Sequence, residues 1–163
     1  MLGRSLRLML PLFVLSILPL RSQPAVWNSV GIGGGGALFN PSISPHKVDE
    51  IFVSCDMTEI FHTTNFGRQW STLDFRQIET TGAYGRMEFT SDPRIIYTLG
   101  LVNDGGVPYQ TNDRGVTWNP IPSDPTAGDA WNLVADPNRT DRIVVSDYST
   151  LFLSTDAGAS WSQ

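Results

Sequence analysis

Short apolar runs separated by glycine- and proline-containing turns recur along the chain after residue 25, and each run predicts a β-strand. Three pairs of such runs are evident, at 51–55 with 60–63, 95–99 with 107–111, and 143–146 with 151–154. An earlier strand is expected before each pair, at 38–43, 87–90 and 131–135, and a last one begins at 70–75 and 118–121. We expect no helix after residue 25, so the pattern favours an all-β fold.

Each pair of strands runs into the same short motif. A hydroxyl residue is followed two places on by Asp or Asn, two further by Gly, and three beyond that by Trp. The three copies are Thr63, Asn65, Gly67 and Trp70; Thr111, Asp113, Gly115 and Trp118; and Ser154, Asp156, Gly158 and Trp161. A short carboxylate or amide accepts hydrogen bonds from its own turn, and Gly adopts positive φ, so the spacing predicts a tight turn.

The repeat length determines the expected architecture. Four short strands in roughly 45 residues match one blade of a β-propeller. We therefore expect antiparallel four-stranded blades at about 26–75, 76–122 and 123–163. Closed propellers have about four to eight blades. Three blades predict an incomplete propeller, which is a fragment, a truncated gene product or half of an assembly.

The three motifs resemble the Asp-box, or BNR, repeat of sialidases, sortilin-type receptors, photosystem assembly factors and xyloglucanases. In those families the repeat lies on outer hairpins, away from the catalytic face. The resemblance therefore implies a structural role for Asn65, Asp113 and Asp156, which agrees with the turn chemistry.

A narrower resemblance covers residues 27–70. The glycine-rich run at 27–36, then Pro45-His46 and Phe52-Val53-Ser54-Cys55-Asp56, look like the opening blade of endo-xyloglucanases of glycoside hydrolase family seventy-four. The resemblance implies that Asp56 is the general base of an inverting mechanism. The general acid of that family comes from a second propeller, and no residue of this chain matches it, so we expect the chain alone to be inactive.

Two observations favour a plainer role for Asp56. The family usually has a pair of glycines soon after the base, whereas Met57-Thr58-Glu59 follows here. Asp104 and Asp147 also occupy the same place relative to their own motifs. A residue that recurs in every blade is equally explained as a turn residue between two strands. Asp56 is thus a candidate base with a structural alternative.

The first 25 residues have the three-part form of a secretory signal: Arg4 and Arg7, an apolar run at 8–20, and small residues before a cleavage site. We expect a secreted or periplasmic protein that is not held in a membrane after cleavage. An uncleaved anchor is the alternative, because Arg21 adjoins the apolar run. Cys55 is the only cysteine, and a small buried strand residue is a better interpretation of it than a nucleophile.

The net charge of −5 and the single lysine argue against nucleic acid as a partner, because an acidic surface repels phosphates. No cofactor is expected. Gly31, Gly33 and Gly36 formally fit a dinucleotide motif but precede a strand instead of opening a helix. His46 and His62 lack metal-site spacing.

The sequence is compatible with two functions, of which one belongs to an enzyme and the other to a binding protein. The first is the N-terminal part of a polysaccharide-active hydrolase of xyloglucanase type. The alternative is a non-catalytic propeller that binds a protein or glycan, as sortilin-like and assembly-factor-like proteins do. A polysaccharide or glycan, a protein partner and missing C-terminal blades are the expected partners. A sialidase ranks third, because its arginine cluster and tyrosine nucleophile cannot be assigned.

Overall fold

The computed structural model describes residues 36–57, 59–82 and 84–163, and all regular structure in this part of the chain is β. The predicted signal region therefore lies outside the described residues. The strands are β1 (Leu38–Ile43), β2 (Ile51–Cys55), β3 (Ile60–Thr63), β4 (Ser71–Thr72), β5 (Glu88–Phe89), β6 (Ile96–Val102), β7 (Gly105–Thr111), β8 (Asn119–Pro120), β9 (Asn132–Ala135), β10 (Ile143–Ser146) and β11 (Leu151–Ser154).

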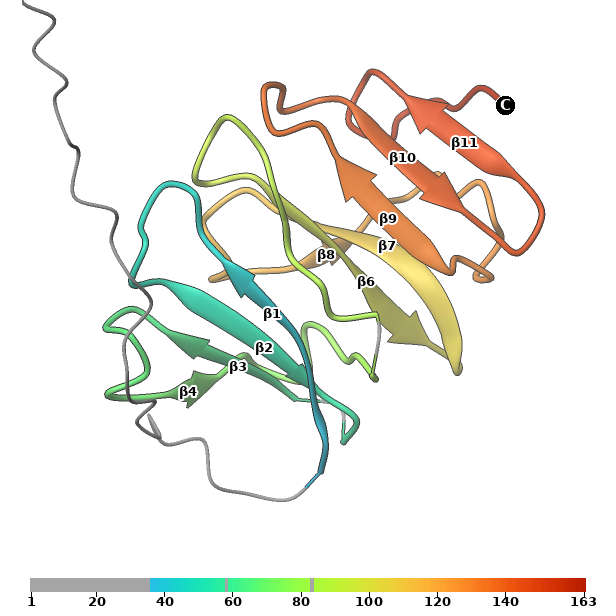
Figure 1. Ribbon diagram of the computed structural model, residues 1–163. Helices are drawn as coiled ribbons and strands as arrows, with labels where there is room; N and C mark the ends of the chain where they lie inside the picture. The colour runs from blue at the N-terminus through green and yellow to red at the C-terminus, as the bar shows by residue number, and fades with distance from the viewer. Residues whose placement is uncertain (1–35, 58, 83) are drawn as a thin grey trace, which may run out of the picture.

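Three antiparallel sheets follow one another along the chain and lie side by side in Figure 1. Two are four-stranded, with the orders β1-β2-β3-β4 and β5-β6-β7-β8, and the third has the order β9-β10-β11. Ser162 adds an isolated bridge to Leu153 where a fourth strand would pair. Each sheet is a simple up-and-down meander, so the predicted all-β fold of propeller blades is confirmed.

Apolar layers between the sheets hold the blades together. Phe52 and Ile60 of the first sheet pack with Ile96, Tyr109 and Trp118 of the second. On the opposite face of the second sheet, Tyr97 and Leu99 contact a cluster from the third. That cluster comprises Leu133, Ala135, Ile143 and Val145. Alternate side chains of β6 thus face different neighbours, as the two-residue period of a strand requires.

The third sheet has an apolar face directed away from the second. Val134 pairs in register with Val144, and Val144 pairs with Leu153. Val134 and Leu153 are exposed, as is Leu151 on the same face. The corresponding face of the second sheet is buried against the third. The described sheets therefore do not close on themselves, and the propeller is incomplete.

The central hairpin is longer and tighter than predicted. The sequence predicts strands at 95–99 and 107–111, but β6 and β7 extend toward each other until only Asn103 and Asp104 remain between them. Both residues have positive φ, 51° and 65°, which is the conformation that two-residue hairpins require. In contrast, β4, β5 and β8 are only two residues long, shorter than predicted.

Candidate functional site

The three repeated motifs form the same hydrogen-bonded turn in each blade. The hydroxyl oxygen of Thr63, Thr111 or Ser154 donates to the Asx Oδ1 at 3.0, 2.8 and 2.7 Å, respectively. It also accepts from the N–H of Gly67, Gly115 or Gly158 at 3.0, 2.9 and 2.8 Å. The same Oδ1 accepts the backbone N–H of Gln69, Thr117 or Ser160 at 2.9, 2.8 and 2.9 Å. One hydroxyl and one Asx oxygen therefore satisfy the backbone of each turn.

The turn carboxylates of the second and third motifs are held in the ionised state. A hydrogen bond from the Thr117 hydroxyl, together with the backbone N–H of Thr117, lowers the pKa of Asp113. The Ser160 hydroxyl and N–H lower the pKa of Asp156 to about 2. Each donor stabilises the charged form of its acceptor. These carboxylates serve as acceptors in their own turns and are poorly suited to proton transfer.

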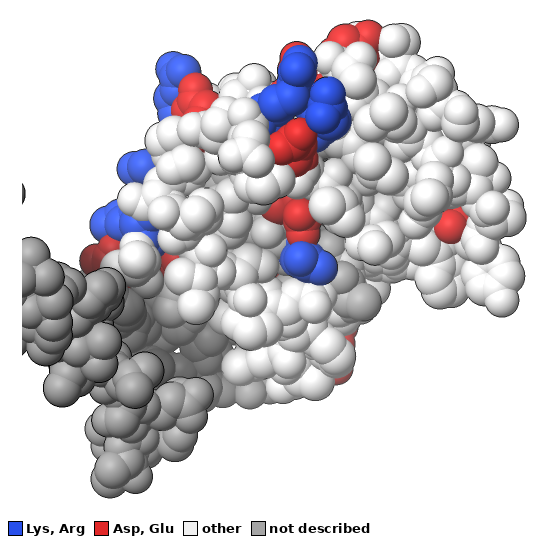
Figure 2. Space-filling model, turned by 45° about the horizontal axis from the view of Figure 1, so that its top comes forward, with Lys and Arg blue, Asp and Glu red and all other residues white. Residues whose placement is uncertain are grey.

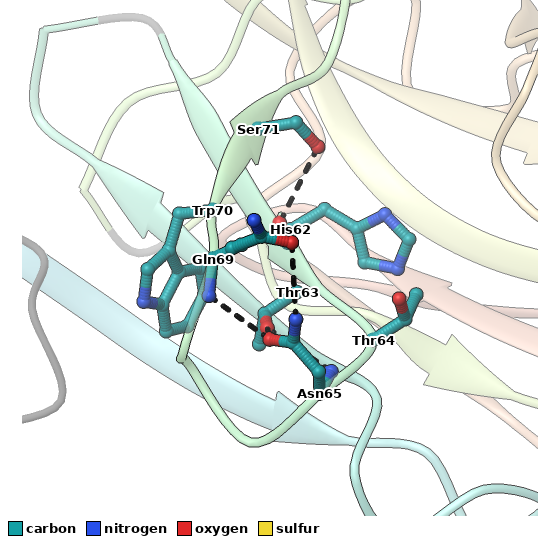
Figure 3. A pocket seen from close by; sticks show the side chains of 7 residues that line it. All are labelled: His62, Thr63, Thr64, Asn65, Gln69, Trp70 and Ser71. Carbon is teal, nitrogen blue, oxygen red and sulfur yellow. Dashed lines mark hydrogen bonds between the residues drawn. The ribbon is translucent and has the colours of Figure 1, made fainter.

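A hollow of about 510 Å³ lies beside the first of these turns and is lined by His62, Thr63, Thr64, Asn65, Gln69, Trp70 and Ser71. Figure 3 shows the Asn65 and Gln69 amides facing each other, and Asn65 Nδ2 donates to Gln69 Oε1 at 3.4 Å. His62 lies 3.3 Å from Glu50 and stacks on Phe52. Burial lowers the pKa of His62, with Glu50 opposing that shift. Most polar side chains that line this hollow therefore already make hydrogen bonds within the protein.

Each turn in the second and third blades rests on the preceding blade. A Cβ added to Gly158 would lie 2.6 Å from Cγ2 of Ile121, which follows β8. The indole N–H of Trp161 donates to the Ser123 carbonyl in the same segment. In the second blade, a Cβ added to Gly115 would lie 3.7 Å from Cε1 of Phe52 in β2, and Trp118 packs in the same apolar cluster as Phe52. The tryptophan end of the motif thus joins successive blades.

Asp56 lies at the end of β2, in the turn to β3, and is exposed. Its Oδ1 accepts the N–H of Ala37 at 2.8 Å and the thiol of Cys55 at 3.6 Å. The chain can pass this close only because residue 36 is glycine, with φ of 89°. Asp56 is therefore an exposed carboxylate with one oxygen fixed by the segment that leads into the first blade.

The aspartates at the matching position of the other blades make different contacts. Asp104 is in the two-residue hairpin between β6 and β7. Asp147 Oδ1 accepts the N–H groups of Ser149 and Thr150, both at 2.7 Å, and these bonds lower the pKa of Asp147. Among the three, Asp56 is bonded through its side chain to a distant segment instead of its own turn. In Figure 1 the ends of β2, β6 and β10 lie along the same side of the three sheets, which runs from the bottom centre to the right of the picture.

Two large aromatic side chains, for which the sequence predicts no role in binding or catalysis, are exposed at the same edge of the third blade. Trp131, just before β9, is 55% exposed, and Tyr148, between β10 and β11, is 87% exposed. Their ring centroids are 6.0 Å apart in an edge-to-face arrangement. The one signal in the sequence is that Tyr148, an aromatic residue, follows Asp147 in a turn, where side chains are usually exposed.

A second hollow of about 510 Å³ runs beside the innermost strands and includes Pro41, Arg86, Glu88 and Val134. Burial raises the pKa of Glu88, although Arg86 Nε lies 2.7 Å from Glu88 Oε1. Glu88 Oε2 accepts the N–H of Ala135 at 3.3 Å, which links the second and third blades. The sequence does not single out Glu88 as a candidate site residue, because it is an isolated acidic residue in a short strand.

The remaining candidates take structural positions. Cys55 is fully buried, and His46 Nε2 is 2.8 Å from the Thr90 carbonyl. Gly31 and Gly33 fall outside the described residues. Within the residues that the structure describes, no group of three His, Cys, Asp or Glu side chains is placed to hold a metal ion, and no helix could cross a membrane.

Charged side chains on the surface are largely paired. Arg94 with Asp92, and Arg139 with Asp141, are 2.6 and 2.8 Å apart. On the face in Figure 2, basic and acidic groups lie next to each other, without an extended basic patch. Arg94 lowers the pKa of Asp92 to about 2. This face therefore offers no continuous positive surface to a polyanion.

Comparison with known proteins gives relatives in sequence and in fold. No protein-family model matches the chain. A xyloglucanase of Acetivibrio thermocellus is 27% identical over an alignment that covers 87% of this chain and 19% of the relative. The chain therefore spans about a fifth of the length of the curated relative that it matches.

The solved structures that resemble this chain are propeller proteins. YCF48 from Cyanidioschyzon merolae has a TM-score of 0.66 at 16% identity, covering 85% of this chain and 42% of that one. The GH74 xyloglucanase from Xanthomonas campestris has a TM-score of 0.57 at 22% identity, covering 76% of this chain and 22% of its own. At these identities, structural similarity establishes the fold alone. Together with the sequence match, these findings identify the chain as an incomplete β-propeller related to the GH74 xyloglucanases.

Proposed function

We propose that this chain is the N-terminal part of an exported polysaccharide hydrolase of xyloglucanase type, with Asp56 as the general base. The sequence match to a xyloglucanase supports the substrate class. The observation that carries the assignment of Asp56 is the Ala37 N–H bond to Oδ1, 2.8 Å long, on an exposed carboxylate. A base must be fixed in direction while one oxygen stays accessible to a water molecule.

The proposal includes the organisation of the chain. Residues 1–25 are the signal peptide, and residues 26–163 carry three Asp-box blades. The hydrogen-bonded turns at Asn65, Asp113 and Asp156 are the Asp boxes, with a structural function. An inverting glycosidase needs a second carboxyl group roughly 6.5–9.5 Å from the base. That general acid is supplied from outside the described residues, so the isolated chain is inactive.

The test compares Asp56→Asn with Asp104→Asn in the complete gene product. Asparagine keeps an acceptor for the Ala37 N–H, so the fold is preserved while the base is lost. We expect the rate of reducing-end release from xyloglucan to fall by about 10²–10⁴-fold in Asp56→Asn. Asp104→Asn is the matched control from the next blade and should retain activity. Turnover within tenfold of the parent in Asp56→Asn would exclude Asp56 as the base.

The second candidate is a non-catalytic propeller that binds a protein or glycan partner. The structural likeness to YCF48 favours it, because one solved structure of that protein is described as bound to D1 peptide and has a TM-score of 0.60 with this chain. This function predicts no hydrolysis of any neutral glucan by the complete gene product. Robust cleavage that depends on Asp56 would eliminate it.

A further inference from the structure

The pair of exposed aromatic residues at the edge of the third blade is held in a defined geometry. Trp131 donates its backbone N–H to the Ser146 carbonyl at 2.7 Å, at the end of β10. Its indole N–H donates to Asp129 Oδ1 at 3.3 Å. A tryptophan that is 55% exposed is thus anchored at two points.

The turn that carries Tyr148 is also fixed. Asp147, immediately before it, accepts the N–H groups of Ser149 and Thr150, both at 2.7 Å. The hydroxyl of Ser149 donates to the same oxygen at 3.1 Å. Tyr148 therefore projects from a turn whose backbone is ordered before any ligand arrives, which lowers the entropic cost of binding.

The surroundings of the rings indicate which ligand fits. The two rings present apolar surface, and Trp and Tyr are the residues that most often dominate binding when they lie at a contact surface. The flanking charges, Asp129 and Asp147, are both negative, so an anionic ligand would be repelled. Their carboxylates can accept hydrogen bonds from hydroxyl groups. A neutral sugar combines an apolar C–H face with a rim of hydroxyl donors and meets all three conditions.

We propose that Trp131 and Tyr148 form a subsite that stacks a sugar unit of a neutral polysaccharide. This inference rests on the proposed function for its ligand class and adds a binding position to it. The subsite lies at the same edge of the blades as Asp56, two blades away. It holds the polysaccharide at a distance from the bond to be cleaved and contributes to affinity, without a chemical step of its own.

The experiment measures binding of the complete gene product to neutral xyloglucan by affinity gel electrophoresis, and to its soluble oligosaccharides by titration of tryptophan fluorescence. Trp131→Ala and Tyr148→Ala should each weaken binding about tenfold or more, because each removes a stacking surface. Trp131→Phe keeps a ring and should stay close to the parent in affinity, but it should lose the fluorescence response of Trp131. Phe75→Ala, which removes a 59% exposed ring elsewhere, is the matched control and should bind like the parent.

The outcomes separate this subsite from the catalytic assignment. Asp56→Asn should lose cleavage while retaining binding, and Trp131→Ala should lose binding at low polysaccharide concentration. If the parent binds xyloglucan without cleaving it and Trp131→Ala abolishes that binding, the subsite stands and the hydrolase proposal fails. If Trp131→Ala, Tyr148→Ala and the double variant all bind neutral xyloglucan like the parent, the subsite is wrong. Binding of carboxymethylated glucan or of a protein alone, lost in the same variants, would also overturn the ligand class.

Discussion

Gly36 lies against the carboxylate of Asp56 so closely that a Cβ at residue 36 would be 2.4 Å from Oδ1 and 2.7 Å from the Cys55 sulfur. The φ of Gly36 is also positive, at 89°. This contact fixes the path of the chain into the first blade and the direction of the Asp56 side chain together. A change at residue 36 should therefore affect both stability and the candidate base.

Replacing Gly36 with Ala should destabilise the protein by more than replacing Gly128 does. Gly128 has a similar φ of 92° but nothing within 4 Å of an added Cβ, so it isolates the conformational cost. That cost is about 1–2 kcal/mol. Displacement of Asp56 should add about 1 kcal/mol or more at Gly36. Denaturant unfolding of the three proteins measures the difference, and equal losses would show that the Asp56 contact is easily relieved.

Thr111→Val should cost about 1–3 kcal/mol of unfolding free energy, because it leaves the buried N–H of Gly115 without its acceptor. Thr111 is fully buried, and its hydroxyl also donates to Asp113. Thr117→Val removes a hydroxyl bonded to the other oxygen of Asp113 at an exposed site and should cost about 1 kcal/mol or less. If the two variants lose similar amounts of unfolding free energy, the buried hydroxyl of Thr111 is not the main stabilising group of the turn.

Acid should weaken the second and third turns through their carboxylates. The pKa of Asp156 falls from its ordinary 3.8 to about 2 in the folded protein, so the folded state favours the ionised form. This contribution is complete above pH 3.8 and is lost as the pH falls toward 2. The pKa of Asp113 shifts in the same direction.

Thermal unfolding at stepped pH tests this contribution. The melting temperature of the parent should fall more steeply below pH 4 than that of an Asp113→Asn, Asp156→Asn double variant, whose turns then resemble the natural Asn65 turn. Identical slopes would assign the acid sensitivity to other groups.

Ile121→Ala should cost about 2–5 kcal/mol and should be coupled to Trp161→Ala. Ile121 is 5% exposed and belongs to the cluster against which Trp161 packs. A double-mutant cycle should give a coupling free energy of about 0.5 kcal/mol or more, because the two residues share one interface. Val116→Ala, at a 71% exposed residue, is the control and should be nearly neutral. Additive effects would mean that the last blade does not depend on this contact.

Much of the fold follows from local sequence, because turn chemistry repeats with a fixed spacing. The hydroxyl and Gly positions of each motif indicate a turn without knowledge of distant residues, and the three sheets follow from strands that pair with their neighbours in sequence. The hairpin at Asn103 and Asp104 could have been predicted from the glycines that follow it. The local pattern predicts strands only at 95–99 and 107–111, because Gly and Asp, which occur between them, are poor strand residues.

The candidate site was less accessible to sequence reasoning, since it depends on contacts between segments far apart. Asp56, Asp104 and Asp147 are equivalent in spacing, yet only the structure distinguishes a carboxylate that holds Ala37 from one that holds its own turn. The pairing of Trp131 with Tyr148 arises because the start of β9 lies beside the end of β10. This contact depends on the register between β9 and β10, and the sequence around Trp131 or around Tyr148 does not predict it.

Each turn packs on the blade before it, so the protein should behave as a linear array of blades in which each blade contacts only its neighbours. Gly158 and Trp161 can keep their contacts only while Ile121 and Ser123 stay in place, so order in the third blade depends on order in the second. In such arrays, stability is approximately a sum of unit terms and nearest-neighbour terms. Loss of the contacts between the second and third blades should therefore destabilise the third sheet most. Hydrogen exchange would show this as a loss of amide protection in the third sheet before the first.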